Sequence, residues 1–230
     1  SLVGSEMCIR DRSSSMESAK EVKLGHTMIG FPKASNYGWM KIALKAKQKV
    51  VIESEGRHTD SQFSSCLAVF DESGRKVSSS TRTGFLVFEP KQDGTYSIRL
   101  HDFLFKGGEE YLFRLSVTTR PRIHFIDPPL VRIGKPRKAL VYGWNLPGGK
   151  PAGLDLPGNL PLERLETSIH LASEKDLIDP LQTRDPIEST QPRHDYRLSS
   201  PAGNSLPFSL VVCPDDWTKE IPESEAVVEL

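Results

Sequence analysis

Residues Asp93–Val117, DGTYSIRLHDFLFKGGEEYLFRLSV, decide the fold class of this 230-residue chain. Asp93-Gly94 can begin a tight turn, because glycine accepts the positive backbone dihedrals that such a turn needs. Apolar side chains then occur at every second position on both sides of a glycine pair: Tyr96, Ile98, Leu100, Tyr111, Phe113, Leu115 and Val117. A period of two is typical of strands with one buried face. The stretch therefore predicts two strands joined by a glycine turn at Gly107-Gly108.

Short extended runs of the same kind fill residues 21–119, with glycine, proline and aspartate between them. The runs are EVKLGHTMIG, GWMKIALKA, KVVIESEG, SCLAVFDESG, TGFLVFEP, GTYSIRLHD and EYLFRLSVT. Residues 42–47 could form a helix locally, but pairing with the following VVIES run favours a strand. This spacing of strands and turns predicts a β-sandwich.

A second series of strands follows a short linker at residues 120–122, where Pro121 restrains the chain. Its runs are IHFIDPP, KALVYGWNLP, LETSIHLA, HDYRLSSP and LPFSLVVC. Two long proline- and glycine-rich loops, residues 147–161 and 179–193, are expected to be surface excursions. We therefore predict an all-β chain with two tandem β-sandwiches, residues 21–119 and residues 123–213.

The charge balance and the cysteines limit the partners and the compartment. Thirty basic residues against thirty acidic ones argue against nucleic acid as the main partner, because phosphate binding requires a concentrated basic face. No apolar run has membrane-spanning length, so no membrane insertion is expected. Cys66 and Cys213 lie in different predicted domains, which argues against a disulfide. Cys66 in the run CLAVF is expected to be buried as a small hydrophobic residue.

Groups that could support catalysis or bind a metal are scattered along the sequence. His58, Asp60 and Ser61 lie close together, as do His101 and Asp102, but catalytic triads assemble from separate elements and no Gly-x-Ser-x-Gly elbow is present. The run GWNLPGGKPAG lacks the Gly-Lys-Ser/Thr of a phosphate loop. No histidine or cysteine pair has the spacing of a zinc site. We therefore expect a chain that is not an enzyme and has no cofactor or metal.

Four segments of the first series carry a resemblance to a known family: EVKLGHTMIG, SNYGWMKIALKAKQKVVIESEG, LAVFDESGRKVSSS and PKQDGTYSIRLHDFLFKGGEEYLFRLSV. Residues 21–119 resemble the bacterial pre-peptidase C-terminal domain, a jelly-roll β-sandwich of large secreted bacterial proteins. Two acidic loops of the family pattern are replaced here by residues 35–39, SNYGW, and residues 78–81, SSST. Calcium is therefore not expected in those loops, because a hard divalent cation needs several converging carboxylate or carbonyl oxygens.

The second series and the two ends of the chain carry further resemblances. FIDPPLVRIGKPRKALVYGWNLPGGKPAG, PLERLETSIHL and NSLPFSLVV resemble an immunoglobulin-like (IPT/TIG-type) module that follows pre-peptidase domains. DDWTKEIPESEAV, within residues 214–230, resembles the approach to a further domain of the same type. SLVGSEMCIRDR, residues 1–12, resembles a translated sequencing adapter, so residues 1–20 are expected to be artefactual or disordered.

These resemblances imply an exported protein that is extracellular, on the cell surface or periplasmic. We interpret the chain as non-catalytic structural and adhesive modules that contact polysaccharide, cell-surface components or neighbouring domains of the same parent protein. The alternative is a secretion or folding accessory of a protease or other hydrolase whose catalytic domain lies outside this chain. Aromatic residues beside turns are the candidates for contact with sugar rings: Tyr37, Trp39, Trp144 and Trp217.

Overall fold

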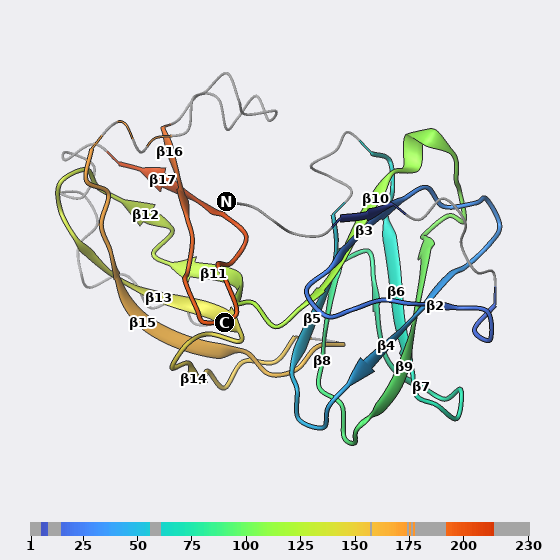
Figure 1. The fold of residues 1–230 in the computed structure, drawn as a ribbon. Helices are drawn as coiled ribbons and strands as arrows, with labels where there is room; N and C mark the ends of the chain where they lie inside the picture. Colours follow the sequence, from blue (N-terminus) through green and yellow to red (C-terminus); the bar gives the residue numbers. More distant parts are fainter. Residues whose placement is uncertain are drawn as a thin grey trace. The chain divides into compact units, whose positions relative to one another are not determined.

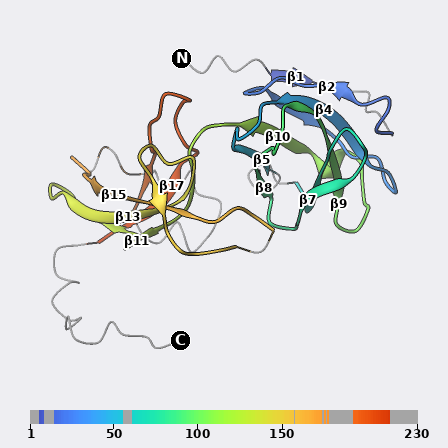
Figure 2. The same ribbon diagram turned by 90° about the horizontal axis from the view of Figure 1, so that it is seen from below.

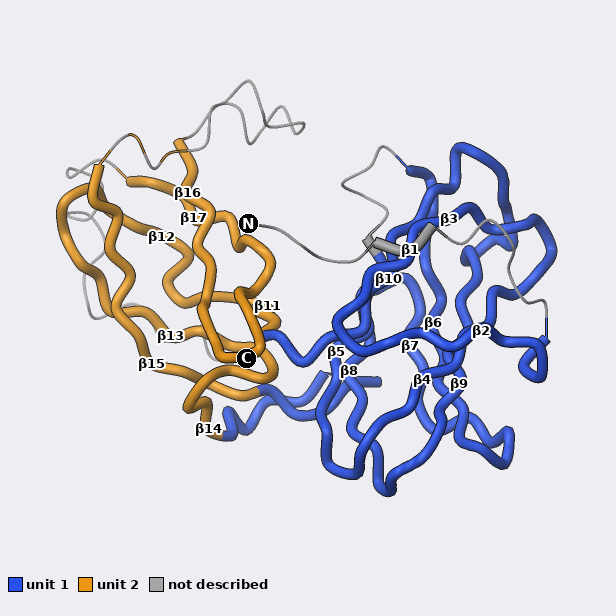
Figure 3. Tube along the Cα trace, viewed as in Figure 1, with its two compact units in different colours: residues 1–120, 151–162 blue, residues 121–150, 163–230 orange. Residues whose placement is uncertain are grey.

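The computed structural model describes residues 6–8, 15–55, 61–156, 158–173, 175, 177 and 192–213. Nearly all regular structure in this part of the chain is β-strand, with one short 3₁₀ helix, η2 (Glu109–Tyr111). The all-β prediction is confirmed. The chain divides into two compact units, Ser1–Arg120 with Pro151–Leu162, and Pro121–Lys150 with Glu163–Leu230 (Figure 3).

Unit 1 is a sandwich of two five-stranded sheets (Figure 1). Sheet A contains, in spatial order, β1 (Glu6–Cys8), β3 (Thr27–Gly30), β10 (Phe113–Thr118), β5 (Val50–Glu55) and β8 (Phe85–Phe88). Sheet B contains β2 (Lys20–Glu21), β4 (Gly38–Leu44), β9 (Gly94–Asp102), β6 (Ser65–Phe70) and β7 (Lys76–Thr81). The orders β3-β10-β5-β8 and β4-β9-β6-β7 are those of a jelly roll, in which eight strands form two interlocked Greek keys. The jelly-roll prediction for the first sandwich is confirmed.

Apolar residues at alternate positions of the strands point between the two sheets and form the core. Met40, Ile42 and Leu44 of β4 are buried, while the alternate residues Trp39 and Lys41 are only partly buried. Each inward Val, Leu, Ile or Phe side chain contributes roughly 1.5–3 kcal/mol relative to its exposed state. The innermost members, at 1% exposure or less, are Ile42, Val50, Ile52, Val69, Leu86, Ile98, Leu100 and Leu115.

The two strands of the opening stretch are present, but they do not form a turn-linked pair. Strand β9 pairs with β4 and β6, whereas β10 pairs with β3 and β5 in the opposite sheet. The connection contains η2, and Tyr111 is buried in the core. Gly107 is required because a Cβ there would lie 2.3 Å from the carbonyl oxygen of Pro32. The predicted glycine turn between the strands is therefore wrong, because alternation defines the buried face of a strand and not its partner.

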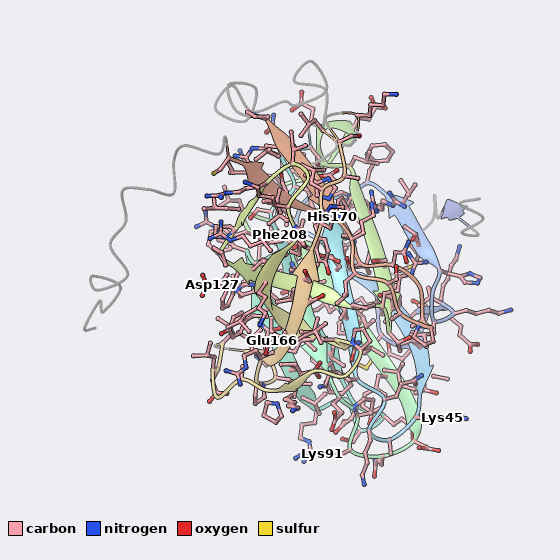
Figure 4. All side chains as sticks on the ribbon, turned by 90° about the vertical axis from the view of Figure 1, so that its left-hand side faces the viewer. Lys45, Lys91, Asp127, Glu166, His170 and Phe208 are labelled. Atoms are coloured by element: carbon pink, nitrogen blue, oxygen red, sulfur yellow. The ribbon has the colours of Figure 1, made fainter. Side chains whose placement is uncertain are left out.

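Two turns of unit 1 are tied together at one end of the sandwich. Lys45 lies in the turn after β4 and Lys91 in the turn after β8, and both are at the lower end of the view in Figure 4. The carboxylate of Asp93 accepts a hydrogen bond from the backbone N–H of Ala46 at 2.7 Å. Asp93 therefore has a structural role that joins the β8–β9 connection to the β4–β5 turn.

Unit 2 is a smaller sandwich of a four-stranded and a three-stranded sheet. Sheet C contains β11 (Arg122–Asp127), β13 (Arg137–Trp144), β15 (Glu163–Ile169) and β14 (Lys150–Pro151), and Figure 2 shows β11, β13 and β15 side by side. Sheet D contains β12 (Leu130–Val131), β17 (Phe208–Val212) and β16 (Arg193–Tyr196). Both sheets supply buried residues to one core, among them Ile126, Val141, Val131 and Leu210. The immunoglobulin-like assignment of this unit remains a prediction.

In the part of the chain that the structure describes, no helix has the length and hydrophobicity to span a bilayer. Cys66 and Cys213 are both free thiols, in different units.

Candidate functional site

The outward side chains of sheet B form two cross-strand rows. Strands β4, β9, β6 and β7 are neighbours in this order, so alternate residues of each strand align across the sheet (Figure 1). The first row is Trp39, Arg99, Ala68 and Ser79, and the second is His101, Cys66 and Thr81. The inward alternates of the same strands, such as Ile98 and Leu67, belong to the core.

A pocket of ≈ 230 Å³ lies on this outer face. Its floor is the central strand β6, where Cys66 and Ala68 have small side chains that leave space between the flanking strands. The side chains that surround the floor are Arg99, His101, Lys76, Ser79, Thr81 and Phe103. The pocket therefore follows from small residues on one strand between larger polar residues on its two neighbours.

Beside the pocket, Arg99 lies within a group of aromatic rings that we call the aromatic cluster. The guanidinium carbon of Arg99 lies 4.5 Å from the ring centroid of Tyr37, 5.1 Å from that of Phe70 and 5.8 Å from that of Trp39. Tyr37 also meets Trp39 edge-on at 6.5 Å, and Trp39 meets Phe70 at 5.1 Å. The members of the aromatic cluster are Tyr37, Trp39, Phe70, Arg99, His101 and Phe105. Contact with three rings restrains the guanidinium, so it loses less conformational entropy when it binds a ligand.

The loop after β9 completes the cluster, and Asp102 organises it. The Asp102 side chain is 3% exposed and accepts hydrogen bonds from the backbone N–H groups of Ser64, Leu104 and Lys106 at 2.9, 2.9 and 3.2 Å. Phe105 has φ 56, a left-handed conformation that is unfavourable for a bulky residue. The Asp102 hydrogen bonds on either side of Phe105 hold this conformation.

The same loop places the Phe105 ring on His101. The two rings stack at 4.3 Å with an interplanar angle of 15°, and Tyr37 meets both of them edge-on. Nδ1 of His101 lies 2.8 Å from the backbone carbonyl oxygen of Asp102, so Nδ1 donates and carries the proton, because a carbonyl oxygen only accepts.

Burial changes the acidity of two groups at the pocket. Burial, and secondarily the charge of Arg99, lowers the pKa of His101, so the neutral imidazole is favoured. Burial raises the pKa of the Cys66 thiol, which keeps it protonated and poorly nucleophilic. The protonated thiol of Cys66 is therefore a poor nucleophile, while the neutral imidazole of His101 keeps Nε2 as a hydrogen-bond acceptor.

The structure brings together two of the four residues expected to contact sugar. Tyr37 and Trp39 are partly buried members of the aromatic cluster. Trp144 is 0% exposed, so it offers no ring face to a ligand, and this burial corrects the expectation for that residue. Trp217 lies outside the described residues.

The sequence neighbours considered for catalysis have structural contacts where they are described. His58 and Asp60 lie outside the described residues, while the Ser61 hydroxyl donates to the carbonyl oxygen of Glu110 at 3.4 Å. His101 contacts the backbone carbonyl of Asp102 and not its carboxylate, which binds backbone amides. Among the described residues, no group of three or more His, Cys, Asp and Glu side chains could hold a metal ion.

Sequence reasoning missed Arg99, Phe70 and the pocket residues Cys66 and Ala68 as parts of one site. A signal for Arg99 was present, because Tyr96, Ile98 and Leu100 face inward and residue 99 must therefore face outward. The register that places Arg99 opposite both Trp39 and Ala68 has no comparable signal in the sequence.

Solved structures similar to this chain share little sequence identity with it, as two of them illustrate. No protein-family model matches the chain, and no curated protein matches it. The chain is similar to the pre-peptidase C-terminal domain of a collagenase from Bacillus anthracis, with 15% identity, 47% of this chain and 99% of that chain covered, and a TM-score of 0.37. It is also similar to PliG from Aeromonas hydrophila, a periplasmic inhibitor of g-type lysozyme, with 14% identity, 44% and 99% covered, and a TM-score of 0.30.

Proposed function

We propose that this chain is a non-catalytic binding module of an exported bacterial protein, and that the outer face of sheet B contacts polysaccharide. The observation that carries this proposal is the aromatic cluster beside the pocket on that face. An outward sheet face normally presents separate polar side chains to water. Here two aromatic side chains, Tyr37 and Trp39, lie next to a hollow lined with hydrogen-bonding groups.

The chemistry of the face suits a sugar chain. Indole and phenol rings pack against the C–H faces of pyranose rings and keep a polar group available at their edge. The Ser79 and Thr81 hydroxyls and the Arg99 guanidinium can hydrogen-bond to sugar hydroxyls. No nucleophile and base are hydrogen-bonded to each other among the described pocket residues, which supports binding over turnover.

The test is the affinity of the full chain for a panel of soluble oligosaccharides, neutral and acidic, measured by calorimetry. We expect Trp39→Ala to weaken binding roughly tenfold or more, because buried aromatic contacts often exceed about 1.4 kcal/mol in a binding site. Trp144→Phe is the matched control, since Trp144 is 0% exposed, and it should leave the affinity unchanged. Thermal unfolding establishes that both variants are folded.

Two results would contradict the proposal. One is a wild-type chain that binds no member of the panel. The other is an affinity for the bound saccharide that stays the same in Trp39→Ala and in a Tyr37→Ala/Trp39→Ala double variant that is still folded.

A further inference from the structure

We infer that the pocket beside Arg99 binds an anionic group, and that the ligand of this face is an acidic saccharide whose carboxylate enters the pocket. This inference rests on the proposed function and specifies its ligand class. Two observations support it: the charged side chains that line the pocket are cationic, and Arg99 forms no ion pair with a described residue.

Arg99 is a partly buried cation that has no anionic partner among the described residues. Its contacts are the rings of Tyr37, Trp39 and Phe70, and its Nε has no hydrogen-bond partner. No described Asp or Glu forms an ion pair with it. Removing a charge from water without pairing it is costly, and rings compensate only part of that cost. A carboxylate from a ligand would supply the missing partner.

Three other polar side chains of the pocket, Lys76, Ser79 and Thr81, can also donate to an anion. Strand β6 lies between β9 and β7, so Arg99 on β9 and Lys76 on β7 lie on opposite sides of the pocket floor. Ser79 and Thr81 add hydroxyl groups on the Lys76 side. No aspartate or glutamate among the described residues lines the pocket, so the charged groups of its described lining are all cationic.

The charge of Asp102 acts on Cys66 and His101 at the pocket, but the Asp102 side chain does not line the pocket. The carboxylate of Asp102 is engaged by the backbone amides of Ser64, Leu104 and Lys106. The thiol of Cys66, on the pocket floor, stays protonated because burial raises its pKa. The charged side chains of the described pocket lining, Arg99 and Lys76, are therefore both cationic, and a carboxylate could pair with them.

The position of the aromatic cluster favours a saccharide as the carrier of the carboxylate. Arg99 contacts Tyr37 and Trp39 and also lines the pocket, so one ligand can pack a ring on the aromatic side chains and place its acid group beside the guanidinium. A uronic acid has both features in one residue. Guanidinium and carboxylate form two parallel hydrogen bonds that fix the ligand's orientation.

The test compares oligogalacturonate with its methyl ester, which has the same sugar rings without the charge. We expect the full chain to bind the acid roughly tenfold more tightly than the ester, because hydrogen bonds to charged groups are the stronger ones. High salt should weaken binding of the acid and leave binding of the ester nearly unchanged. Arg99→Gln should lower the affinity for the acid roughly tenfold, with a smaller change for the ester.

Two further variants keep the result interpretable. Arg114→Gln removes the same charge from an exposed position on β10 in the other sheet, and should leave the affinity for the acid unchanged. Lys76→Gln affects an exposed side chain at the pocket, so folding is not at risk, and should weaken binding of the acid a few-fold.

The inference is overturned if acid and ester bind equally, if folded Arg99→Gln keeps the wild-type affinity for the acid, or if polyglutamate of similar length binds as tightly as oligogalacturonate. A chain that binds neutral members of the panel and rejects the acid also overturns it, and leaves the proposed function standing. A chain that binds no saccharide overturns both.

Discussion

The two outward faces of the unit 1 sandwich differ in chemistry although they belong to the same fold. On sheet A, the outward residues Val51, Phe85 and Val87 are apolar and nearly inaccessible, at 2%, 6% and 2% exposure. The edge strand β8 is also closed, because the backbone N–H of Val87 donates to the side-chain oxygen of Asn159 at 2.9 Å. Sheet B presents rings, charges and a pocket instead.

The difference between the two sheets follows from the residues at the outward positions of their strands. Strands β5 and β8 begin VVI and FLVF, so they are apolar on both faces, as expected for strands buried on both sides. Strand β9, GTYSIRLHD, alternates strictly, and its outward positions carry arginine and histidine. In β5 and β8 the continuous apolar run accompanies a covered face, and in β9 the alternation accompanies a face with polar side chains, whereas the apolar run of β6 provides the pocket floor through its small residues Cys66 and Ala68.

Removing the Phe85 ring is the most damaging way to test this difference. We expect Phe85→Ala to lower the free energy of unfolding by about 3 kcal/mol, because a 6% exposed ring leaves a cavity when truncated. Saccharide affinity of the folded fraction should not change, since Phe85 lies in sheet A. Urea denaturation followed by tryptophan fluorescence measures the first effect. If fully folded Phe85→Ala loses saccharide affinity, ligand binding is not specific to the outer face of sheet B.

Asp102→Ala should have the next largest effect, and on the other face. Three backbone N–H groups lose their acceptor, which we expect to cost about 2 kcal/mol of stability, because the loop amides can partly regain water. Saccharide binding should also weaken, since the loop positions Phe105 against His101. Asp93→Ala, which removes one hydrogen bond at the far turn, is the control for stability without an effect on binding. If Asp102→Ala binds saccharide with the wild-type affinity, the loop after β9 does not contribute to the binding site.

The pH dependence of His101 should be the smallest effect. Burial lowers its pKa below the usual 6.5, so at a pH between the folded and unfolded values the unfolded chain holds a proton that the folded chain does not. The free energy of unfolding should therefore fall as pH drops below about 6.5 and level off below the folded pKa. His101→Gln should reduce this slope, whereas exposed His170→Gln should not. His124 contributes with the same sign, since burial also lowers its pKa. An unchanged slope in His101→Gln would contradict the assignment.

Strands could be predicted from the sequence where apolar side chains alternate with polar ones or form continuous runs. A strand made mostly of serines could not be predicted in this way. Strand β9 was expected from Tyr96, Ile98 and Leu100, whereas β7, KVSSST, was not included among the expected strands because it has little apolar content. Serine-rich strands form through their backbone ladder with a neighbour, here β6. The composition of residues 76–81 alone does not indicate that they pair with β6.

The candidate site was only half predictable for a related reason. Tyr37 and Trp39 could be selected because they follow a polar turn. Arg99 becomes a site residue only through its register with Trp39 and Ala68 across two strand pairs. Trp144 also follows the selection rule, and yet its surroundings bury it completely. Long-range contacts decide the outcomes for Arg99 and Trp144, and a single sequence does not contain these contacts.

Unit 1 is assembled from two separate stretches of the chain, and this matters for anyone who clones it. A shortened gene that stops at codon 120 would omit residues 151–162, and with them the side chain that caps the amide of Val87. The recombinant product would display an uncapped edge strand, which is a common cause of insolubility. Soluble expression of the jelly roll therefore calls for a boundary beyond Leu162, or for the returning segment to be grafted back through an artificial linker.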